Sequence, residues 1–180
     1  MLGGLLVAAV AAIVALVLSD GASPSSALAD CGNAVENAPR VAIGDRVPDF
    51  TLPSLNGGCV SFRDLRGQPA VINFWASWCN PCRREFPEFR DAQEHHESDG
   101  LEIVGITHDD IVSDSQRFAR ERHANWKLLA DEQSDVADMF RVGQIPQTIF
   151  VDRQGKVRSH VFGFTTARQL EREIRALLGR

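Results

Sequence analysis

The chain has 180 residues, 44% of them hydrophobic and 24% charged, which is the composition of a globular protein rather than a fibrous or disordered one. It carries 19 Lys and Arg against 24 Asp and Glu, a net charge of −5, and no basic cluster stands apart from neighbouring acids. Nucleic acid is therefore not expected as a partner. Only residues 2–18 form an uncharged apolar run, so a protein with several membrane spans is excluded as well.

This apolar run would cover roughly 26 Å as a helix, close to the hydrocarbon thickness of about 30 Å. We expect residues 1–18 to be a membrane anchor or a signal segment, and Ala27 and Ala29 fit a signal cleavage site that lies well beyond the run. Acidic residues after the run favour export of the C-terminal part. The protein is thus predicted at the cell membrane with a single span and an extracytoplasmic domain, or as a secreted protein if the segment is cleaved.

Residues 19–40 are rich in Ser, Ala, Asp and Asn and predict an extracytoplasmic tether, followed by one domain over residues 41–180. The pattern in that domain predicts, in chain order, a hairpin of residues 50–52 and 60–62, a buried strand over 70–75, a helix from about residue 81, a strand over 101–107, helices over 113–123 and 131–140, a hairpin of 148–152 and 156–162, and a helix over 167–178. This order indicates an α/β fold whose first strands are parallel and whose last are antiparallel.

Two cysteines, Cys79 and Cys82, follow the predicted strand over 70–75 at the start of a predicted helix. Two intervening residues bring their Cβ atoms within disulfide range. Cys79 would lie at the helix N-terminus, where unpaired N–H groups favour a thiolate, and Cys82, one turn further, would be shielded and react second. The pattern predicts thiol-disulfide exchange.

Metal and haem chemistry fit the sequence less well. A zinc site needs a second pair of ligands, and the other two cysteines, Cys31 and Cys59, are single and far apart. Covalent haem attachment needs a His directly after Cys82, where the chain has Arg83. The five histidines show no ligand spacing, so we expect neither a metal nor another cofactor.

The segment Phe-Trp-Ala-Ser-Trp-Cys-Asn-Pro-Cys at residues 74–82 resembles the active-site segment of the thioredoxin superfamily. Pro87, five residues after Cys82, and Ile145-Pro146, before a predicted strand, are similar to the superfamily's helix proline and cis-proline turn. Nearly all of residues 41–180 share the resemblance. It implies a thioredoxin fold, with a central mixed sheet flanked by helices.

Further features resemble one branch, the membrane-anchored, extracytoplasmic TlpA/ResA/CcmG-like thiol-disulfide oxidoreductases. They are Pro48-Asp49-Phe50, the segment 82–87 and the apolar N-terminus. The branch adds an N-terminal β-hairpin extension to the fold.

The resemblance also implies roles for the residues of the site. Cys79 is the nucleophile and Cys82 resolves the mixed disulfide. The expected substrate-binding residues are Trp78, Asn80, Pro81, Ile145 and Pro146. A cis bond before Pro146 would turn the Ile145 backbone toward the dithiol, where it offers main-chain hydrogen bonds to an extended substrate.

Asn73 occupies the position of a buried acid in thioredoxin itself, and we expect Glu85 to replace it. Three residues after Cys82, Glu85 lies on the same helix face and can exchange a proton with that thiol. The alternative is a solvated glutamate on a charged helix face. Arg83 and Arg84 could favour the thiolate or could simply be solvated.

Cys31 and Cys59 form an even pair in an exported protein, which favours a structural disulfide between the tether and the hairpin. The alternative for Cys31 is lipid attachment, because Leu28-Ala29-Asp30-Cys31 has the outline of a lipid-attachment box. Asp30 opposes it, since a small residue is required there.

The resemblance implies a protein disulfide reductase that acts on apocytochrome c before haem attachment and is rereduced by a membrane electron carrier of the CcdA/DsbD type. The direction of electron flow is not in the sequence, so an oxidase that forms disulfides is an alternative. A peroxidase is another, because Pro48-Asp49-Phe50 also occurs in peroxiredoxin-like chains, but Ala76 stands where those need Thr or Ser. A redox-inert binding module would not need Cys79 and Cys82.

Overall fold

The computed structural model describes residues 28–32, 35 and 38–180. The predicted anchor or signal segment, residues 1–18, and the first part of the predicted tether lie outside the described residues. Within the described part of the chain, no helix is long and apolar enough to cross a membrane.

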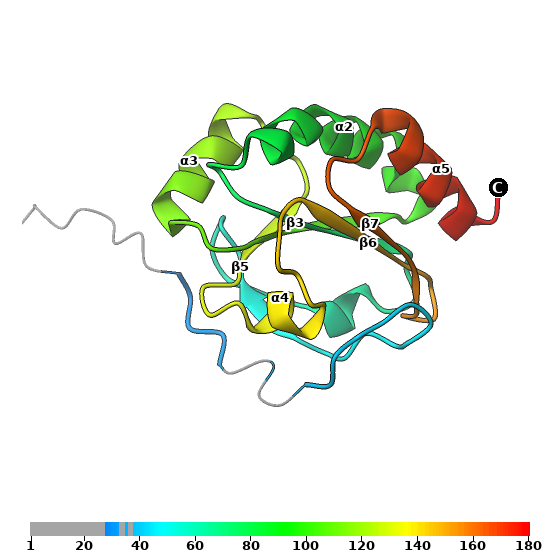
Figure 1. Cartoon of the computed structure of the whole chain (residues 1–180), viewed down its shortest axis with the longest axis horizontal. Helices are drawn as coiled ribbons and strands as arrows, with labels where there is room; N and C mark the ends of the chain where they lie inside the picture. Colours follow the sequence, from blue (N-terminus) through cyan, green and yellow to red (C-terminus); the bar gives the residue numbers. More distant parts are fainter. Residues whose placement is uncertain (1–27, 33–34, 36–37) are drawn as a thin grey trace, which may run out of the picture.

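A five-stranded mixed sheet, in the order β5-β4-β3-β6-β7, forms the centre of the molecule (Figure 1). Its strands are β3 (Ala70–Trp75), β4 (Glu102–Thr107), β5 (Lys127–Ala130), β6 (Gln147–Val151) and β7 (Val157–Phe162). The pairs β3/β4 and β4/β5 are parallel, whereas β3/β6 and β6/β7 are antiparallel. All six residues of β3 are buried, because helices cover both faces of the sheet.

Three helices, α2 (Asn80–His96), α3 (Val112–Glu121) and α5 (Ala167–Leu178), cover one face of the sheet, and the short α4 (Asp135–Met139) lies on the other (Figure 1). A separate apolar cluster fills each side of the sheet. This arrangement is a thioredoxin fold, with the mixed sheet and the flanking helices that the sequence predicts.

An antiparallel hairpin of β1 (Thr51–Pro53) and β2 (Cys59–Ser61) precedes the central sheet. Gly57 and Gly58 have positive φ values of 96° and 74°, which glycine adopts without a steric penalty. The turn between the strands also reaches β5, where the Leu55 N–H donates to the Leu128 carbonyl over 2.8 Å. The predicted hairpin extension is therefore present and covers the outer edge of β5.

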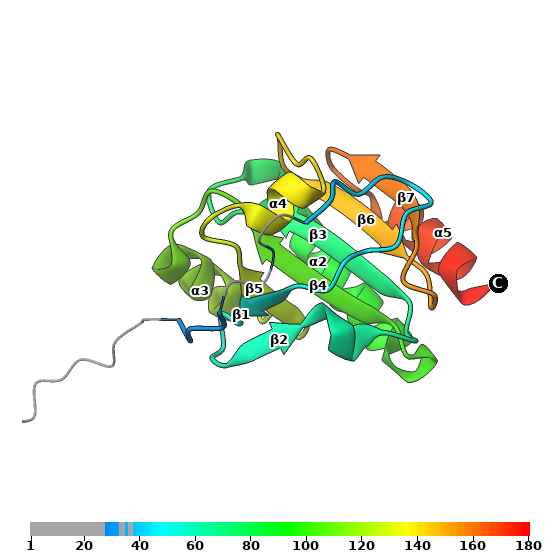
Figure 2. The same ribbon diagram turned by 90° about the horizontal axis from the view of Figure 1, so that it is seen from below.

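The segment before β1 lies against the domain. Figure 2 shows it running out over β6 and β7 and returning to β1. Along this path the Val47 N–H donates to the Gly155 carbonyl over 2.9 Å. Further upstream, Leu28 packs against the apolar cluster on the α2 side of the sheet, and Cys31 forms a disulfide with Cys59 at a Cα–Cα distance of 5.7 Å.

Two elements differ from the sequence expectation. The strand β5 was not predicted, although it pairs with β4 along its whole length. The predicted helix over 131–140 is wrong at its start, because α4 begins only at Asp135. The carboxylate of Asp131 instead accepts hydrogen bonds from the N–H groups of Val136 and Ala137, and so occupies the N-terminal donors of the helix.

Candidate active site

Cys79 is the N-cap residue of α2, directly after the loop that follows β3. Its Sγ accepts a hydrogen bond from the Cys82 N–H over 3.2 Å, and the two cysteines form a disulfide with a Cα–Cα distance of 5.3 Å. Pro81 suits the first turn, where a missing N–H costs nothing. After reduction, the same N–H groups and the helix dipole would favour a thiolate on Cys79.

The loop before Cys79 is fixed from the β4–α3 side. Asp110 accepts from the Ser77 N–H over 2.5 Å and from the Ser77 hydroxyl over 2.9 Å. Trp78 is 59% exposed, and its Nε1 donates to the Asp109 carbonyl over 2.8 Å. This leaves the indole at the rim beside Cys79.

Neither arginine after Cys82 is simply solvated. Arg83 donates from Nη1 to the Ser77 carbonyl over 2.9 Å, and its guanidinium lies 4.7 Å from the centre of the Phe118 ring. Arg84 lies 5.1 Å from the ring centre of Phe164. Both charges have fixed partners around the dithiol.

The Ile145–Pro146 peptide bond is cis, and the Pro146 carbonyl accepts from the Gly163 N–H over 2.9 Å. Ile145 is partly buried and packs against the same apolar cluster that contains Cys79 and Cys82. The fold thus brings this turn, more than sixty residues away in the chain, to the dithiol.

Glu85 is 1% exposed and is not on a solvated helix face. One carboxylate oxygen accepts a hydrogen bond from the Thr165 N–H, and the other has no partner. Burial raises the pKa of Glu85 to about 7, although the hydrogen bond from Thr165, the nearby Asn73 amide and the charge of Arg84 oppose the shift. A buried carboxyl that exchanges protons near neutral pH therefore lies one helical turn after Cys82.

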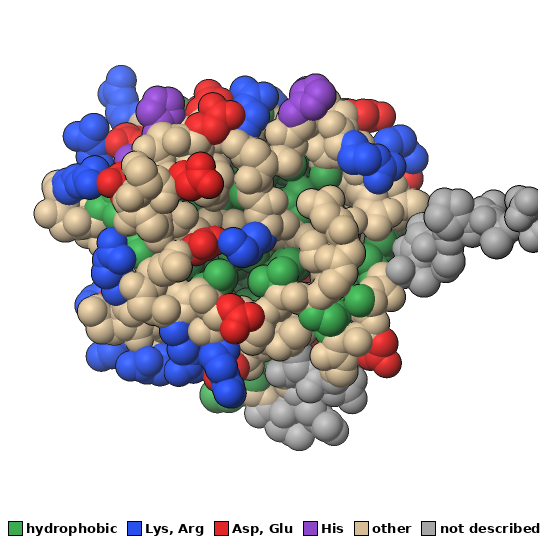
Figure 3. All heavy atoms as spheres, turned by 180° about the vertical axis from the view of Figure 1, so that it is seen from behind, with side chains coloured by type: hydrophobic (Ala, Val, Ile, Leu, Met, Phe, Trp, Pro, Cys, Tyr) green, Lys and Arg blue, Asp and Glu red, His purple; other side chains and the backbone are tan. Residues whose placement is uncertain are grey.

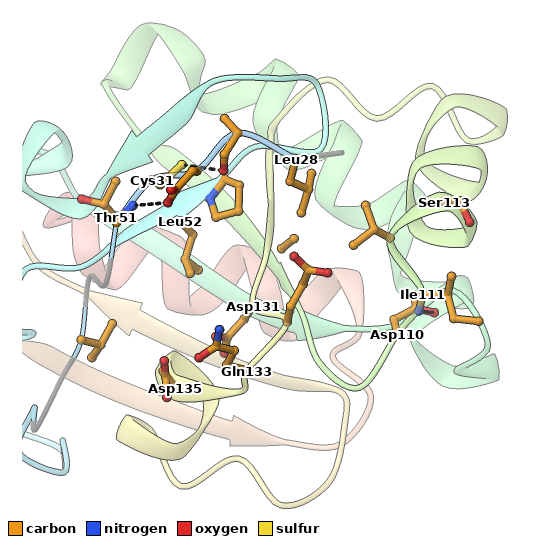
Figure 4. Close-up of a pocket in the computed structure, with 18 residues that line it drawn as sticks. Leu28, Cys31, Thr51, Leu52, Asp110, Ile111, Ser113, Asp131, Gln133 and Asp135 are labelled. Carbon is orange, nitrogen blue, oxygen red and sulfur yellow. Dashed lines mark hydrogen bonds between the residues drawn. The ribbon is translucent and has the colours of Figure 1, made fainter. Parts of the chain in front are cut away.

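A cavity of about 840 Å³ lies beside this site, between the segment at residues 28–32 and the loops that follow β4 and β5. Figure 4 shows Leu28 and Cys31 on one side and Asp110 and Ile111 on another. Neither Cys79 nor Cys82 lines the cavity. Asp110 lines the cavity and also binds Ser77, so it connects the cavity wall to the loop before Cys79.

The surface on the far side of the view in Figure 1 carries charges of both signs. Figure 3 shows them around a hollow with apolar side chains at its floor. Among the described residues, no group of three or more His, Cys, Asp or Glu side chains could hold a metal ion.

Sequence reasoning missed Asp110 and Thr165, which hold Ser77 and Glu85. The sequence could have indicated Asp110. It closely follows the predicted strand over 101–107, which is parallel to the strand before Cys79, and neighbouring parallel strands end at the same edge of the sheet. The sequence gives no such indication for Thr165, since it acts through its main-chain N–H.

The fold and the dithiol define a thioredoxin-fold thiol-disulfide oxidoreductase, and comparison with known proteins agrees. The family model described as the AhpC/TSA family matches residues 43–160, well over half of the chain. The thiol-disulfide oxidoreductase ResA of Geobacillus kaustophilus is 30% identical over 137 residues, which cover 76% of this chain and 79% of that relative.

Two solved structures are similar as well. A putative thiol:disulfide interchange protein DsbE from Chlorobium tepidum has a TM-score of 0.72 and 33% identity, covering 77% of this chain and 99% of that one. The structure of MTB dsbF in mixed oxidized and reduced forms has a TM-score of 0.67 and 32% identity, covering 71% of this chain and 94% of that one. The chain belongs to the AhpC/TSA family and, within it, is a thiol-disulfide oxidoreductase of the ResA and DsbE type.

Proposed function

We propose that this protein reduces disulfides in exported proteins, and that its main substrates are apocytochrome c disulfides before haem attachment. The observation that carries the proposal is the buried Glu85 one turn after Cys82. When Glu85 is ionised, its negative charge disfavours further negative charge on the reduced dithiol. A protein whose reduced dithiol is strongly stabilised is a strong oxidant, whereas one whose reduced dithiol is not stabilised is a reductant.

The reaction begins with attack of the Cys79 thiolate on one sulfur of the client disulfide. The other client sulfur leaves as a thiolate, and a mixed disulfide joins Cys79 to the client. Cys82 then gives its proton to Glu85 and attacks the Cys79 sulfur, so that the second client sulfur leaves. Two electrons pass to the client, and the protein is left with the Cys79–Cys82 bond.

The client lies against Trp78, Asn80 and Pro81 on one side and against Ile145 and Pro146 on the other. An extended client segment would use main-chain groups of Ile145. The exposed indole of Trp78 and the partly buried Ile145 support this placement.

Residues 1–18 would hold the domain at the membrane or direct its export, and residues 19–40 would connect it. A polytopic membrane dithiol carrier of the CcdA/DsbD type would return the Cys79–Cys82 disulfide to the dithiol. Each turnover consumes two electrons and two protons, which a reductant must supply.

Equilibration with a thiol-disulfide redox buffer tests the direction of electron flow. We expect a reduction potential near −270 mV, typical of reductants, and stoichiometric reduction of an oxidised Cys-X-X-Cys-His peptide. A potential near −120 mV with net disulfide formation would favour the oxidase instead. Consumption of peroxide would favour a peroxidase, although Ala76 has no hydroxyl to offer at the expected position.

A further inference from the structure

The side chain of Gln147 closes the turn that carries the cis peptide bond. Gln147 directly follows Pro146 as the first residue of β6 and is 4% exposed. Its Nε2 donates to the Gln144 carbonyl over 2.7 Å, and its Oε1 lies 2.7 Å from Nε2 of His160 on β7. One buried amide therefore joins the start of the turn to the neighbouring strand.

The hydrogen-bond partners fix the proton on the imidazole. A carbonyl only accepts, so Nε2 of Gln147 must face Gln144, and its Oε1 must then receive a proton from Nε2 of His160. Burial lowers the pKa of His160, which keeps the ring neutral with its single proton at this nitrogen near neutral pH. The ring also stacks on Phe162 with a centroid distance of 4.1 Å.

Gln147 and His160 support a segment that has few other hydrogen bonds. Residues 141–146 contain no helix or strand. The main chain holds the segment at its two ends, through the Val142 N–H to the Ala137 carbonyl and the Gly163 N–H to the Pro146 carbonyl. Gln144, in the middle, is held by Gln147, which in turn is oriented by His160.

We infer that His160, acting through Gln147, is a positioning residue for client binding: it holds the Ile145–Pro146 turn in the orientation that presents main-chain groups to the client. The inference rests on the proposed docking role of that turn. Loss of the His160 proton donor would leave the buried Gln147 oxygen unpaired and free the amide to release Gln144. Neither Gln147 nor His160 hydrogen-bonds to Cys79 or Cys82, so the chemistry of the dithiol should be unaffected.

Kinetics of peptide reduction test the inference. His160→Leu replaces the ring with an apolar side chain and removes the donor, His160→Gln restores an N–H donor, and His95→Leu changes an exposed histidine near the C-terminal end of α2. For an oxidised Cys-X-X-Cys-His peptide, we expect His160→Leu to raise KM about three- to tenfold with kcat within about twofold, as loss of one hydrogen bond would give. His160→Gln should recover most of the KM, and His95→Leu should match the wild type.

A small aromatic disulfide, which makes no main-chain contacts, serves as the internal reference. The rate with it and the reduction potential should be the same in all four proteins. An unchanged peptide KM in His160→Leu would overturn the inference, as would an equal loss with the small disulfide or a failure of His160→Gln to recover. If the wild type forms rather than reduces disulfides, the reductase proposal fails, and the same KM comparison with the dithiol peptide still decides the role of His160.

Discussion

Glu85 combines a position that helix periodicity predicts with an environment that it does not. The spacing of three residues places Glu85 on the same helix face as Cys82, which is enough to suggest proton exchange. Its buried environment includes the Thr165 N–H, eighty residues later, and the amide of Asn73 in β3. Contacts of that kind are set by tertiary packing. The sequence alone therefore could not distinguish a buried Glu85 from a solvated one.

Glu85→Gln should keep the fold and slow the exchange, since the amide replaces the carboxyl in shape but cannot accept the Cys82 proton. We expect a loss of roughly 10²-fold or more in the rate of the step that resolves the mixed disulfide near pH 7. Rapid-mixing kinetics with a protein disulfide substrate measure that step. Rates equal to those of the wild type would remove Glu85 from the mechanism.

The same variant tests the raised pKa through protein stability. The folded protein retains the Glu85 proton up to about pH 7, whereas the unfolded chain loses it near 4.5, so the unfolding free energy falls as the pH rises through this window. The decrease in unfolding free energy is complete above pH 7 and amounts to about 3 kcal/mol for a carboxyl this deeply buried.

Urea unfolding of the oxidised protein at pH 5 and pH 8 measures the effect. Relative to Glu85→Gln, the wild type should lose stability between these two values, and Glu94→Gln, which changes an exposed carboxyl on the same helix, should behave as the wild type. Parallel pH profiles for wild type and Glu85→Gln would contradict the raised pKa.

Among the elements, the hairpin and the segment before it are joined by the Cys31–Cys59 disulfide across a sequence separation of 28. An even number of cysteines in a chain expected to be exported suggested this pairing. In the structure the bond fixes one side of the large cavity, because Cys31 and Leu28 line it. A cysteine held in this bond is not available for lipid attachment.

Thiol counting tests the pairing. After mild reduction of the native protein we expect two alkylated cysteines, Cys79 and Cys82, because a loop-closing structural disulfide resists reduction. Replacement of both Cys31 and Cys59 by serine should lower the unfolding free energy by about 3.5 kcal/mol in the chain-entropy model. Four alkylated cysteines, or lipid on Cys31, would contradict the assignment.

The long elements were predictable, whereas the short strand β5 and the start of the short helix α4 were not. The strands β3 and β4 are mostly apolar runs, and α5 has a regular apolar face, so the predicted bounds of each lie within about one residue of those in the structure. The strand β5 has only four residues, and a run of that length does not distinguish a strand from the start of a helix. The late start of α4 depends on the side chain of Asp131, which accepts hydrogen bonds from the first turn. The apolar periodicity places Asp131 inside the helix instead.

For the whole molecule, the order of elements predicted the class of fold but not the contacts that complete the site. Cys79, Cys82 and the Ile145–Pro146 turn carry local motifs that can be read directly. Asp110, Thr165 and the His160–Gln147 pair lie on other strands and loops and reach the site only because β3 lies between β4 and β6. A motif predicts the reacting atoms, while the sheet order determines which residues support them.

The central claim is that Cys79 forms a mixed disulfide with exported clients and that Cys82 resolves it. Because Cys82 lies one helical turn away, its effective concentration is high and the intermediate is normally short-lived. A Cys82→Ala protein expressed in its own membrane should therefore accumulate covalent adducts that dissolve on addition of reductant. Cys79→Ala combined with Cys82→Ala is the matched control and should form none.

Identification of the trapped proteins by mass spectrometry is the most direct test. We predict adducts with proteins that carry Cys-X-X-Cys-His and with a polytopic membrane thiol carrier. Adducts spread over many exported proteins without that motif would contradict the reductase proposal and favour an oxidase. A complete absence of adducts, with the Cys79 thiol shown to be reduced and accessible, would contradict the exchange mechanism itself.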